Sequence, residues 1–299
     1  MVAVLETENL TRRFGRFVAV DQLNLRVEEG DIYGFLGLNG AGKTTTIRMC
    51  LQLIRPTAGR VRLFGQDLRD SFISIMSQVG ALVELPAYYP HLSARTNLEI
   101  LRVMSPGIER SRIDEVLELV GLGERRDSKV RTYSQGMRQR LGIAMALLPR
   151  PRLVILDEPT NGLDPQGIAD IRTVLLNLNR REGVTLLISS HLLHEVEVTC
   201  TRVGILKSGK LVEQETVEAI LAKAGTTVRI QADPAPRALE IVKALPFVQG
   251  AATDGNGGVT VRVPPERRAE VNAELVKAGV KVSGFVPEQM TLENYFLSR

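Results

Sequence analysis

Short apolar runs alternate with longer amphipathic segments along the chain up to about residue 215. The apolar runs are rich in β-branched residues and predict strands at 23–27, 32–36, 60–64, 153–156 and 184–189. The amphipathic segments have helical spacing and predict helices at 43–53, 93–104, 111–120, 135–148 and 165–180. This alternation is typical of an α/β fold, in which helices cover a sheet. Every position from Leu153 to Leu156 is apolar, which indicates a central strand buried on both faces.

The span from about 93 to 150 has the helical pattern and no predicted strand, so it predicts a helical subdomain inserted into the α/β core. Ser93 and Ser111 begin two predicted helices of this span, and Ser134 precedes a third. Because a Ser side chain accepts a hydrogen bond from a free N–H group of the first turn, all three are predicted N-caps.

The pattern changes near residue 222. The elements predicted beyond it are a strand at 226–232, a helix at 235–245, a strand at 247–253, a hairpin turn at 254–258, a strand at 259–263, a helix at 265–278 and a strand at 280–285. The order β-α-β-β-α-β is that of the split, ferredoxin-like unit. We therefore expect one domain over residues 1–221 and a small α+β domain over 222–299.

The composition adds little to this picture: 44% of the 299 residues are hydrophobic and 24% are charged, as in an ordinary folded protein. The net charge is +4, and its densest excess, 12 basic against 7 acidic side chains at 95–152, is spread along predicted helices. This distribution favours a solvated or partner-facing surface and no nucleic-acid partner. Cys50 and Cys200 lack metal-site spacing, and no apolar run approaches the roughly 20 residues of a membrane-spanning helix.

A glycine-rich segment joins the predicted strand 32–36 to the helix that begins near Lys43. It reads Gly37-Leu38-Asn39-Gly40-Ala41-Gly42-Lys43-Thr44 and fits the pattern G-x-x-x-x-G-K-[ST]. In this context the backbone N–H groups point at phosphate oxygens, Lys43 supplies positive charge, and the Thr44 hydroxyl is a ligand for Mg²⁺. The alternative is a glycine-rich turn without function, but the flanking strand and helix favour phosphate binding.

Two successive carboxylates, Asp157 and Glu158, follow the apolar strand 153–156. Ligands of parallel sheets bind at the carboxyl ends of the strands. Asp157 would there hold the metal ion, and Glu158 would polarise the water that attacks the γ-phosphate. An Asp-Glu pair at a strand end is by itself often a solvated turn. Together with a phosphate-binding loop, it indicates a nucleotide kinase, a helicase or a transporter motor.

A second anion site distinguishes among these classes. Tyr133-Ser134-Gln135-Gly136-Met137 opens a predicted helix and places a hydroxyl and free N–H groups at its positive end. Phe14 lies upstream of the glycine-rich loop, and Glu84 lies between that loop and Tyr133. Asn161-Gly162-Leu163-Asp164 follows the two carboxylates, and His191 stands at the end of the next strand. In this order the motifs resemble those of ATP-binding cassette (ABC) proteins over residues 4–220. The resemblance implies a P-loop NTPase cassette with a RecA-like core, a β-subdomain and a helical subdomain.

The same resemblance implies a role for each motif residue. In that family two cassettes face each other head to tail and bury two ATP molecules. Phe14 would stack on adenine, and the phosphates would lie on Gly37, Leu38, Asn39, Gly40, Ala41, Gly42, Lys43, Thr44 and Thr45. Thr44, Asp157 and Glu84, which replaces the family's metal-sensing Gln, would serve Mg²⁺.

Catalysis would rest on Glu158, His191 and Lys43, whereas Ser134, Gly136 and Asp164 would contact the ATP or surface of the other subunit.

Structural alternatives exist for several of these residues. Phe14 is also compatible with a core aromatic, and His191 with a helix cap, with His194 as a rival. Asp164 is in addition an ordinary N-cap before Pro165. The signature departs from the family's Leu-Ser-Gly-Gly-Gln at Gln135 and Met137, which puts those two contacts in doubt.

The resemblance is strongest to bacterial export-type cassettes of the multidrug, antibiotic or polysaccharide kind. It implies an ATPase that powers export through separate membrane permease subunits, paired with a second copy or a paralogous cassette. Its expected place is peripheral, on the cytoplasmic face of the inner (plasma) membrane, with Tyr88 and Tyr89 in the segment that receives a permease helix. The alternatives are a soluble cassette ATPase that acts on ribosomes or DNA, and a nucleotide-gated regulatory module.

Overall fold

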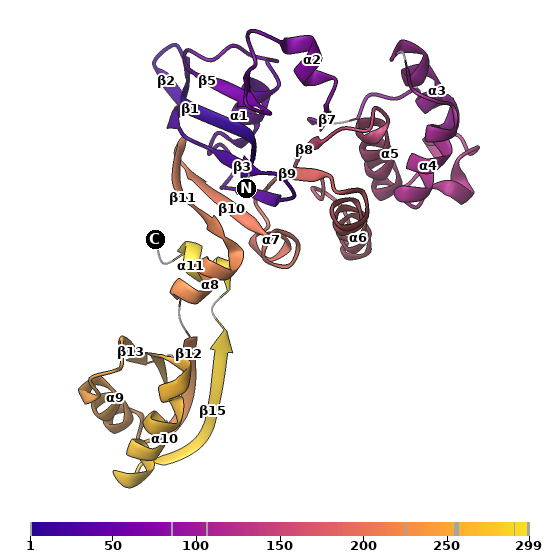
Figure 1. Cartoon of the computed structure of the whole chain (residues 1–299). Coiled ribbons are helices and arrows are strands. Elements are labelled where there is room, and N and C mark those ends of the chain that lie inside the picture. Colours follow the sequence, from indigo (N-terminus) through magenta and orange to yellow (C-terminus); the bar gives the residue numbers. More distant parts are fainter. Residues whose placement is uncertain are drawn as a thin grey trace. The chain divides into compact units, whose positions relative to one another are not determined.

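A six-stranded sheet lies at the centre of the first of the two units into which the chain divides, Met1–Thr216 and Val217–Arg299 (Figure 1). The structure is a computed structural model that describes residues 2–84, 86–105, 107–224, 226–253, 257–289 and 291–297. The strand order is β11 (Lys210–Thr216), β10 (Arg202–Lys207), β4 (Ile32–Leu36), β9 (Thr185–Ser190), β8 (Leu153–Asp157) and β7 (Val79–Leu82). All but β11 run parallel, so the loops that follow the parallel strands begin at one edge of the sheet.

Helices cover this sheet, as the alternating pattern predicts. They include α1 (Lys43–Cys50), α6 (Pro165–Glu182) and α7 (Leu193–Thr199), which contact β8, β9 and β4 respectively. All five residues of β8 are buried, which confirms the prediction of a buried central strand. The hydrophobic core includes Tyr33 and Phe35 of β4, Ile155 of β8 and Leu187 of β9.

An antiparallel sheet precedes and flanks this core. It contains β2 (Phe17–Leu23), β1 (Ala3–Phe14), β5 (Ala58–Leu63) and β6 (Gln66–Asp67), and β3 (Arg26–Glu28) also pairs with β1. The prediction of a single strand at 23–27 is wrong, because β2 ends at Leu23 and β3 begins only at Arg26. Buried Thr7 fills the break: its hydroxyl donates to the Leu23 carbonyl and accepts from the Leu25 N–H, both at 2.8 Å.

The span predicted to be helical contains α3 (Ala94–Met104), α4 (Ser111–Leu119), α5 (Gln135–Leu147) and the short helices η1 (Gly123–Arg125) and η2 (Val130–Thr132), with α2 (Phe72–Met76) before it. Ser93 and Ser134 cap α3 and α5 as predicted, accepting from the N–H groups of Thr96 and Met137. Ser111 is not a cap. It is the first residue of α4, because Arg110 before it already has helical dihedrals, and its hydroxyl donates to Glu109 instead.

The second unit has its own sheet, in the order β13 (Gly250–Thr253), β14 (Gly258–Val263), β12 (Thr226–Asp233) and β15 (Lys281–Gln289), with every pair antiparallel. This is the strand order of the predicted β-α-β-β-α-β unit. The helices are α8 (Val217–Ala224), α9 (Ala235–Ala244), η3 (Pro265–Arg267), α10 (Arg268–Lys277) and α11 (Leu292–Leu297). The boundary precedes residue 222 because α8 belongs to this unit. Most of the predicted turn at 254–258 lies outside the described residues.

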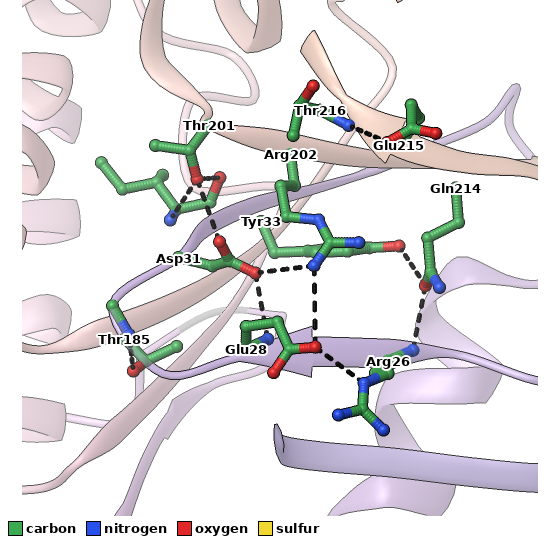
Figure 2. Close-up of polar contacts among 12 residues, drawn as sticks. Arg26, Glu28, Asp31, Tyr33, Thr185, Thr201, Arg202, Gln214, Glu215 and Thr216 are labelled. Atoms are coloured by element: carbon green, nitrogen blue, oxygen red, sulfur yellow. Dashed lines mark hydrogen bonds and ion pairs between the residues drawn. The ribbon is translucent and has the colours of Figure 1, made fainter. Parts of the chain in front are cut away.

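Buried charges join the two sheets of the first unit at the edge where the parallel strands begin. Figure 2 shows the Arg202 guanidinium between the carboxylates of Glu28 and Asp31, with Nη1 3.9 Å from an oxygen of each. Tyr33 donates to the side chain of Gln214 at 2.7 Å, and this side chain also accepts from the Arg26 N–H. Burial raises the pKa of Asp31. These contacts connect β3 with β4, β10 and β11.

Replacing Arg202 with Met is expected to lower the free energy of unfolding by about 2–4 kcal/mol, because it leaves two buried carboxylates without their shared cation. The pKa of Asp31, already raised, should rise further. An acid whose pKa is higher in the folded than in the unfolded state destabilises the fold as pH rises. The loss of unfolding free energy caused by the substitution should therefore be larger near pH 8 than near pH 5. Urea unfolding of the variant and of the unaltered chain at both pH values measures this loss. Lys210→Met, which removes an exposed pair with Asp21, is the control and should change stability by under about 1 kcal/mol.

Candidate nucleotide-binding site

The strand order brings separate motifs to one edge of the core sheet. The glycine-rich loop follows β4, His191 follows β9, Glu158 follows β8 and Glu84 follows β7 shortly after its end. Since β9 lies between β4 and β8, the residues at its end stand between the glycine-rich loop and the carboxylates. This edge is where a parallel sheet binds its ligands.

The glycine-rich loop curls tightly between β4 and α1. Gly42 caps α1 with φ 108°, a conformation that only glycine adopts readily, and a Cβ there would lie 2.5 Å from the Ala19 carbonyl oxygen. A Cβ on Gly37 would lie 2.7 Å from the Leu206 carbonyl oxygen. Both glycines are therefore required for the loop to fit between its neighbours. The loop leaves Leu38, Asn39 and Gly40 exposed, as a phosphate cradle requires.

Lys43, Glu158 and His191 form one contact chain beside the loop. The buried Lys43 side chain donates from Nζ to the Gly37 carbonyl at 2.7 Å and lies 3.0 Å from Glu158 Oε1. The other carboxylate oxygen of Glu158 is 2.7 Å from His191 Nδ1. The structure thus brings together the three residues for which a catalytic role was predicted. His191 is not a helix cap, because Leu192 occupies the N-cap position of α7.

Ser189 belongs to the same site, although the sequence did not single it out. It lies in β9 directly opposite Asp157 of β8 and is fully buried. Its hydroxyl donates to Asp157 Oδ1 at 2.5 Å and accepts from the Glu158 N–H at 2.9 Å. A hydroxyl at the end of an otherwise apolar run was the available signal, but its partner depends on the strand order.

Oxygen donors at this edge suit a magnesium ion. Asp157 is buried at the end of β8 and Thr44 lies in the first turn of α1; a carboxylate and a hydroxyl are the hard ligands that Mg²⁺ prefers. No cluster of three His, Cys, Asp or Glu side chains suited to a metal ion occurs in the described part of the chain. Mg²⁺ commonly takes one or two protein ligands and completes its shell with substrate phosphates and water. Glu84, the third residue predicted to serve Mg²⁺, pairs with Arg48 of α1.

Phe14 lies away from the core at the end of β1. Its side chain is 47% exposed, which excludes a core aromatic, and the Arg12 guanidinium carbon stands 4.5 Å from the centre of its ring. An exposed ring of this kind is available for stacking on a flat base.

The signature residues lie in a different place. A pocket of about 340 Å³ opens between the N-termini of α5 and α6 and is lined by Ser134, Gln135, Gly136, Arg140, Gly162, Leu163, Asp164, Gln166, Gly167 and Asp170. None of these residues belongs to the glycine-rich loop. Asp164 caps α6 as predicted, accepting from the Gly167 N–H at 2.8 Å. The positive end of α5, the Ser134 hydroxyl and the Arg140 guanidinium are groups in this pocket that suit an anion.

The fold and these motifs define a P-loop nucleotide-binding ATPase of the cassette type. The family model described as "ABC transporter" matches residues 20–161. The bacitracin transport ATP-binding protein BcrA of Bacillus licheniformis is 39% identical over 297 residues, 99% of this chain and 97% of that protein. The lantibiotic transport ATP-binding protein SrtF of Streptococcus pyogenes is 37% identical over 211 residues, 70% of this chain and 89% of that protein.

A solved structure has the same fold: the dimeric post-hydrolysis state of an ATP-binding cassette bound to ADP and Pi has a TM-score of 0.63 at 26% identity, covering 71% of this chain and 98% of that one. The chain belongs to the ABC transporter family, as one of its ATP-hydrolysing, nucleotide-binding subunits. Within the ranges that the structure describes, no helix has the length and apolar character needed to cross a membrane.

Proposed function

We propose that this subunit powers the export of an antibiotic of the bacitracin or lantibiotic kind. The names of the relatives support the class of cargo, and the likeness to one of them extends over nearly the whole chain. The observation that carries the hydrolytic part is the Glu158 carboxylate, held between Lys43 and His191 beside the glycine-rich loop. The expected location is the cytoplasmic face of the inner (plasma) membrane, where the subunit would be peripheral.

The proposed chemistry is in-line attack of water on the γ-phosphate of ATP. Glu158 orients and polarises the water, while Lys43 and His191 place positive or hydrogen-bonding groups where charge develops on the phosphate. Mg²⁺, held by Thr44 and Asp157, would neutralise the phosphate oxygens. Glu84 would join this set only after leaving Arg48, since the structure pairs those two side chains.

The site is completed in a head-to-tail dimer, either with a second copy or with a paralogous cassette. The separation of the glycine-rich loop from the signature pocket within one chain supports this dimer, because no residue of the loop lines the pocket. In the dimer, Ser134 and Gly136 of one subunit reach the γ-phosphate bound to the other, and Asp164 lies across the interface. Phe14 stacks on adenine. ATP then holds the two subunits together, and its hydrolysis loosens them.

The surface proposed for the permease subunits is the segment 84–93. The amide of buried Asn97 holds the backbone of Tyr89 within this segment by accepting from the Tyr89 N–H at 2.7 Å and donating to the Tyr89 carbonyl at 3.1 Å. The Tyr89 side chain is 53% exposed. A fixed backbone that presents an exposed aromatic ring suits the docking of a helix from a membrane partner.

A cross-linking experiment tests the dimer. A Glu158→Gln chain that also carries Leu38→Cys and Gln135→Cys is expected to form a disulfide-linked dimer when ATP and Mg²⁺ are added, because head-to-tail contact brings the exposed loop of one subunit to the signature of the other. The native cysteines should not interfere: both are buried, and burial raises the pKa of the Cys50 thiol to about 12 and that of Cys200 further.

A non-reducing denaturing gel measures the covalent dimer. Chains with either added cysteine alone are the controls and should show no cross-linked band. A cross-linked band without nucleotide, or none with it, contradicts the proposed arrangement.

A further inference from the structure

We infer that Ser189 is a positioning residue for ATP hydrolysis: its hydroxyl orients both the carboxylate of Asp157 and the backbone of Glu158. The inference rests on the roles proposed for those two residues. Ser189 is fully buried at the carboxyl end of β9. Its hydroxyl donates to Asp157 Oδ1 at 2.5 Å and accepts from the Glu158 N–H at 2.9 Å. One side chain thus contacts both members of the carboxylate pair.

The contact with Asp157 would act on the metal ion. A carboxylate that accepts a hydrogen bond on one oxygen is held in one orientation, which leaves its other oxygen directed to a ligand. Asp157 and Ser189 are opposite each other in the parallel pairing of β8 and β9, so the bond needs no bend of either strand. The Asp157 rotamer is therefore set by the neighbouring strand.

The contact with Glu158 would act on the attacking water. Glu158 has φ 51°, in the left-handed region that a residue with a side chain disfavours, and the hydroxyl of Ser189 accepts from its N–H. The same backbone orientation directs the carboxylate to Lys43 at 3.0 Å and to His191 at 2.7 Å. Without the hydroxyl, the Glu158 N–H would lose its acceptor and the carboxylate would be less well placed.

Strand β9 itself offers a matched comparison at its other end. Thr185 is also buried, and its hydroxyl accepts a hydrogen bond from the Gly30 N–H at 3.0 Å (Figure 2). It lies far from the carboxylate edge, because it begins the strand that Ser189 nearly ends. A buried hydroxyl that only satisfies a backbone donor should behave like Thr185. Thr185→Ala therefore reports the purely structural cost of removing such a group.

The experiment compares Ser189→Ala, Ser189→Thr and Thr185→Ala in the full chain. We expect Ser189→Ala to lower kcat for ATP about 10–100-fold with KM changed by less than about 3-fold, as for groups that orient a metal ligand. In the Glu158→Gln background, where turnover is absent, Mn²⁺ binding in the presence of ATP, followed by electron paramagnetic resonance, should weaken about 10-fold. Ser189→Thr keeps the hydroxyl and should restore both values, and Thr185→Ala should change neither.

The inference is wrong if Ser189→Ala retains kcat and Mn²⁺ affinity within about twofold, or if Thr185→Ala changes them equally. Ser189→Cys, which keeps the size and a weak donor, replaces the Ala variant if that variant does not fold, and should lie between Ser and Ala. Hydrolysis by Glu158→Gln would contradict the proposed function itself, whereas an inactive Glu158→Gln beside a fully active Ser189 variant contradicts this inference alone.

Discussion

Replacing Glu158 with Gln should lower the turnover of ATP by about 100-fold or more while nucleotide binding persists. Gln has nearly the size of Glu and still fits between Lys43 and His191, which contact the carboxylate at 3.0 and 2.7 Å. An amide, however, is neither charged nor basic, so it polarises the attacking water far less. Because ATP stays intact, the variant should also accumulate as an ATP-bound dimer.

Two measurements check this expectation: phosphate release in the steady state, and sedimentation with and without ATP and Mg²⁺. Glu29→Gln is the matched control, because Glu29 is an exposed carboxylate paired with Arg152 and away from the site. It should hydrolyse ATP like the unaltered chain and dimerise only transiently. A Glu158→Gln protein that remains monomeric with ATP, or that turns over normally, would falsify the assigned role.

Replacing Lys43 with Ala should reduce kcat/KM for ATP by about 100-fold or more, through weaker nucleotide binding as well as slower chemistry. The Lys43 side chain is only 6% exposed, and its Nζ stands between the Gly37 carbonyl and Glu158. It is therefore a desolvated cation, which interacts more strongly with phosphate than an exposed one does. Its loss also removes the ion pair with Glu158, which keeps its contact with His191.

Binding of a fluorescent ATP analogue and steady-state hydrolysis measure the two effects separately. Lys277→Ala removes an exposed lysine that pairs with Glu274 in the second unit, and it should leave both values unchanged. Tight nucleotide binding by Lys43→Ala, close to that of the unaltered chain, would exclude the phosphate contact assigned to this lysine.

Much of the fold follows from local pattern. The strand predicted at 32–36 has the bounds of β4, and the helices predicted at 93–104 and 165–180 are close to α3 and α6. These elements have strong periodicity, and the helices have clear start signals: Ser93 before α3, and Asp164 with Pro165 at the start of α6.

Local pattern fails where tertiary contacts replace local ones. The run 23–27 alternates apolar and polar residues as a strand does, but the side chain of Thr7, distant in sequence, bonds to the backbone between β2 and β3. Strand β1 was not among the predicted strands, and its burial does not alternate regularly, because it pairs with β2, β3 and β5 along different stretches.

The amino-acid sequence alone was enough to predict the chemical groups of the site: a phosphate loop after one strand, two carboxylates after another, a histidine after a third and a signature at a helix start. Which of these groups are in contact depends on the tertiary structure. Because β9 pairs between β4 and β8, His191 and Lys43 contact the Glu158 carboxylate, and Ser189 contacts Asp157. Hydrogen bonds between strands join residues far apart along the chain, so the identity of a strand's neighbour is not encoded in its local pattern.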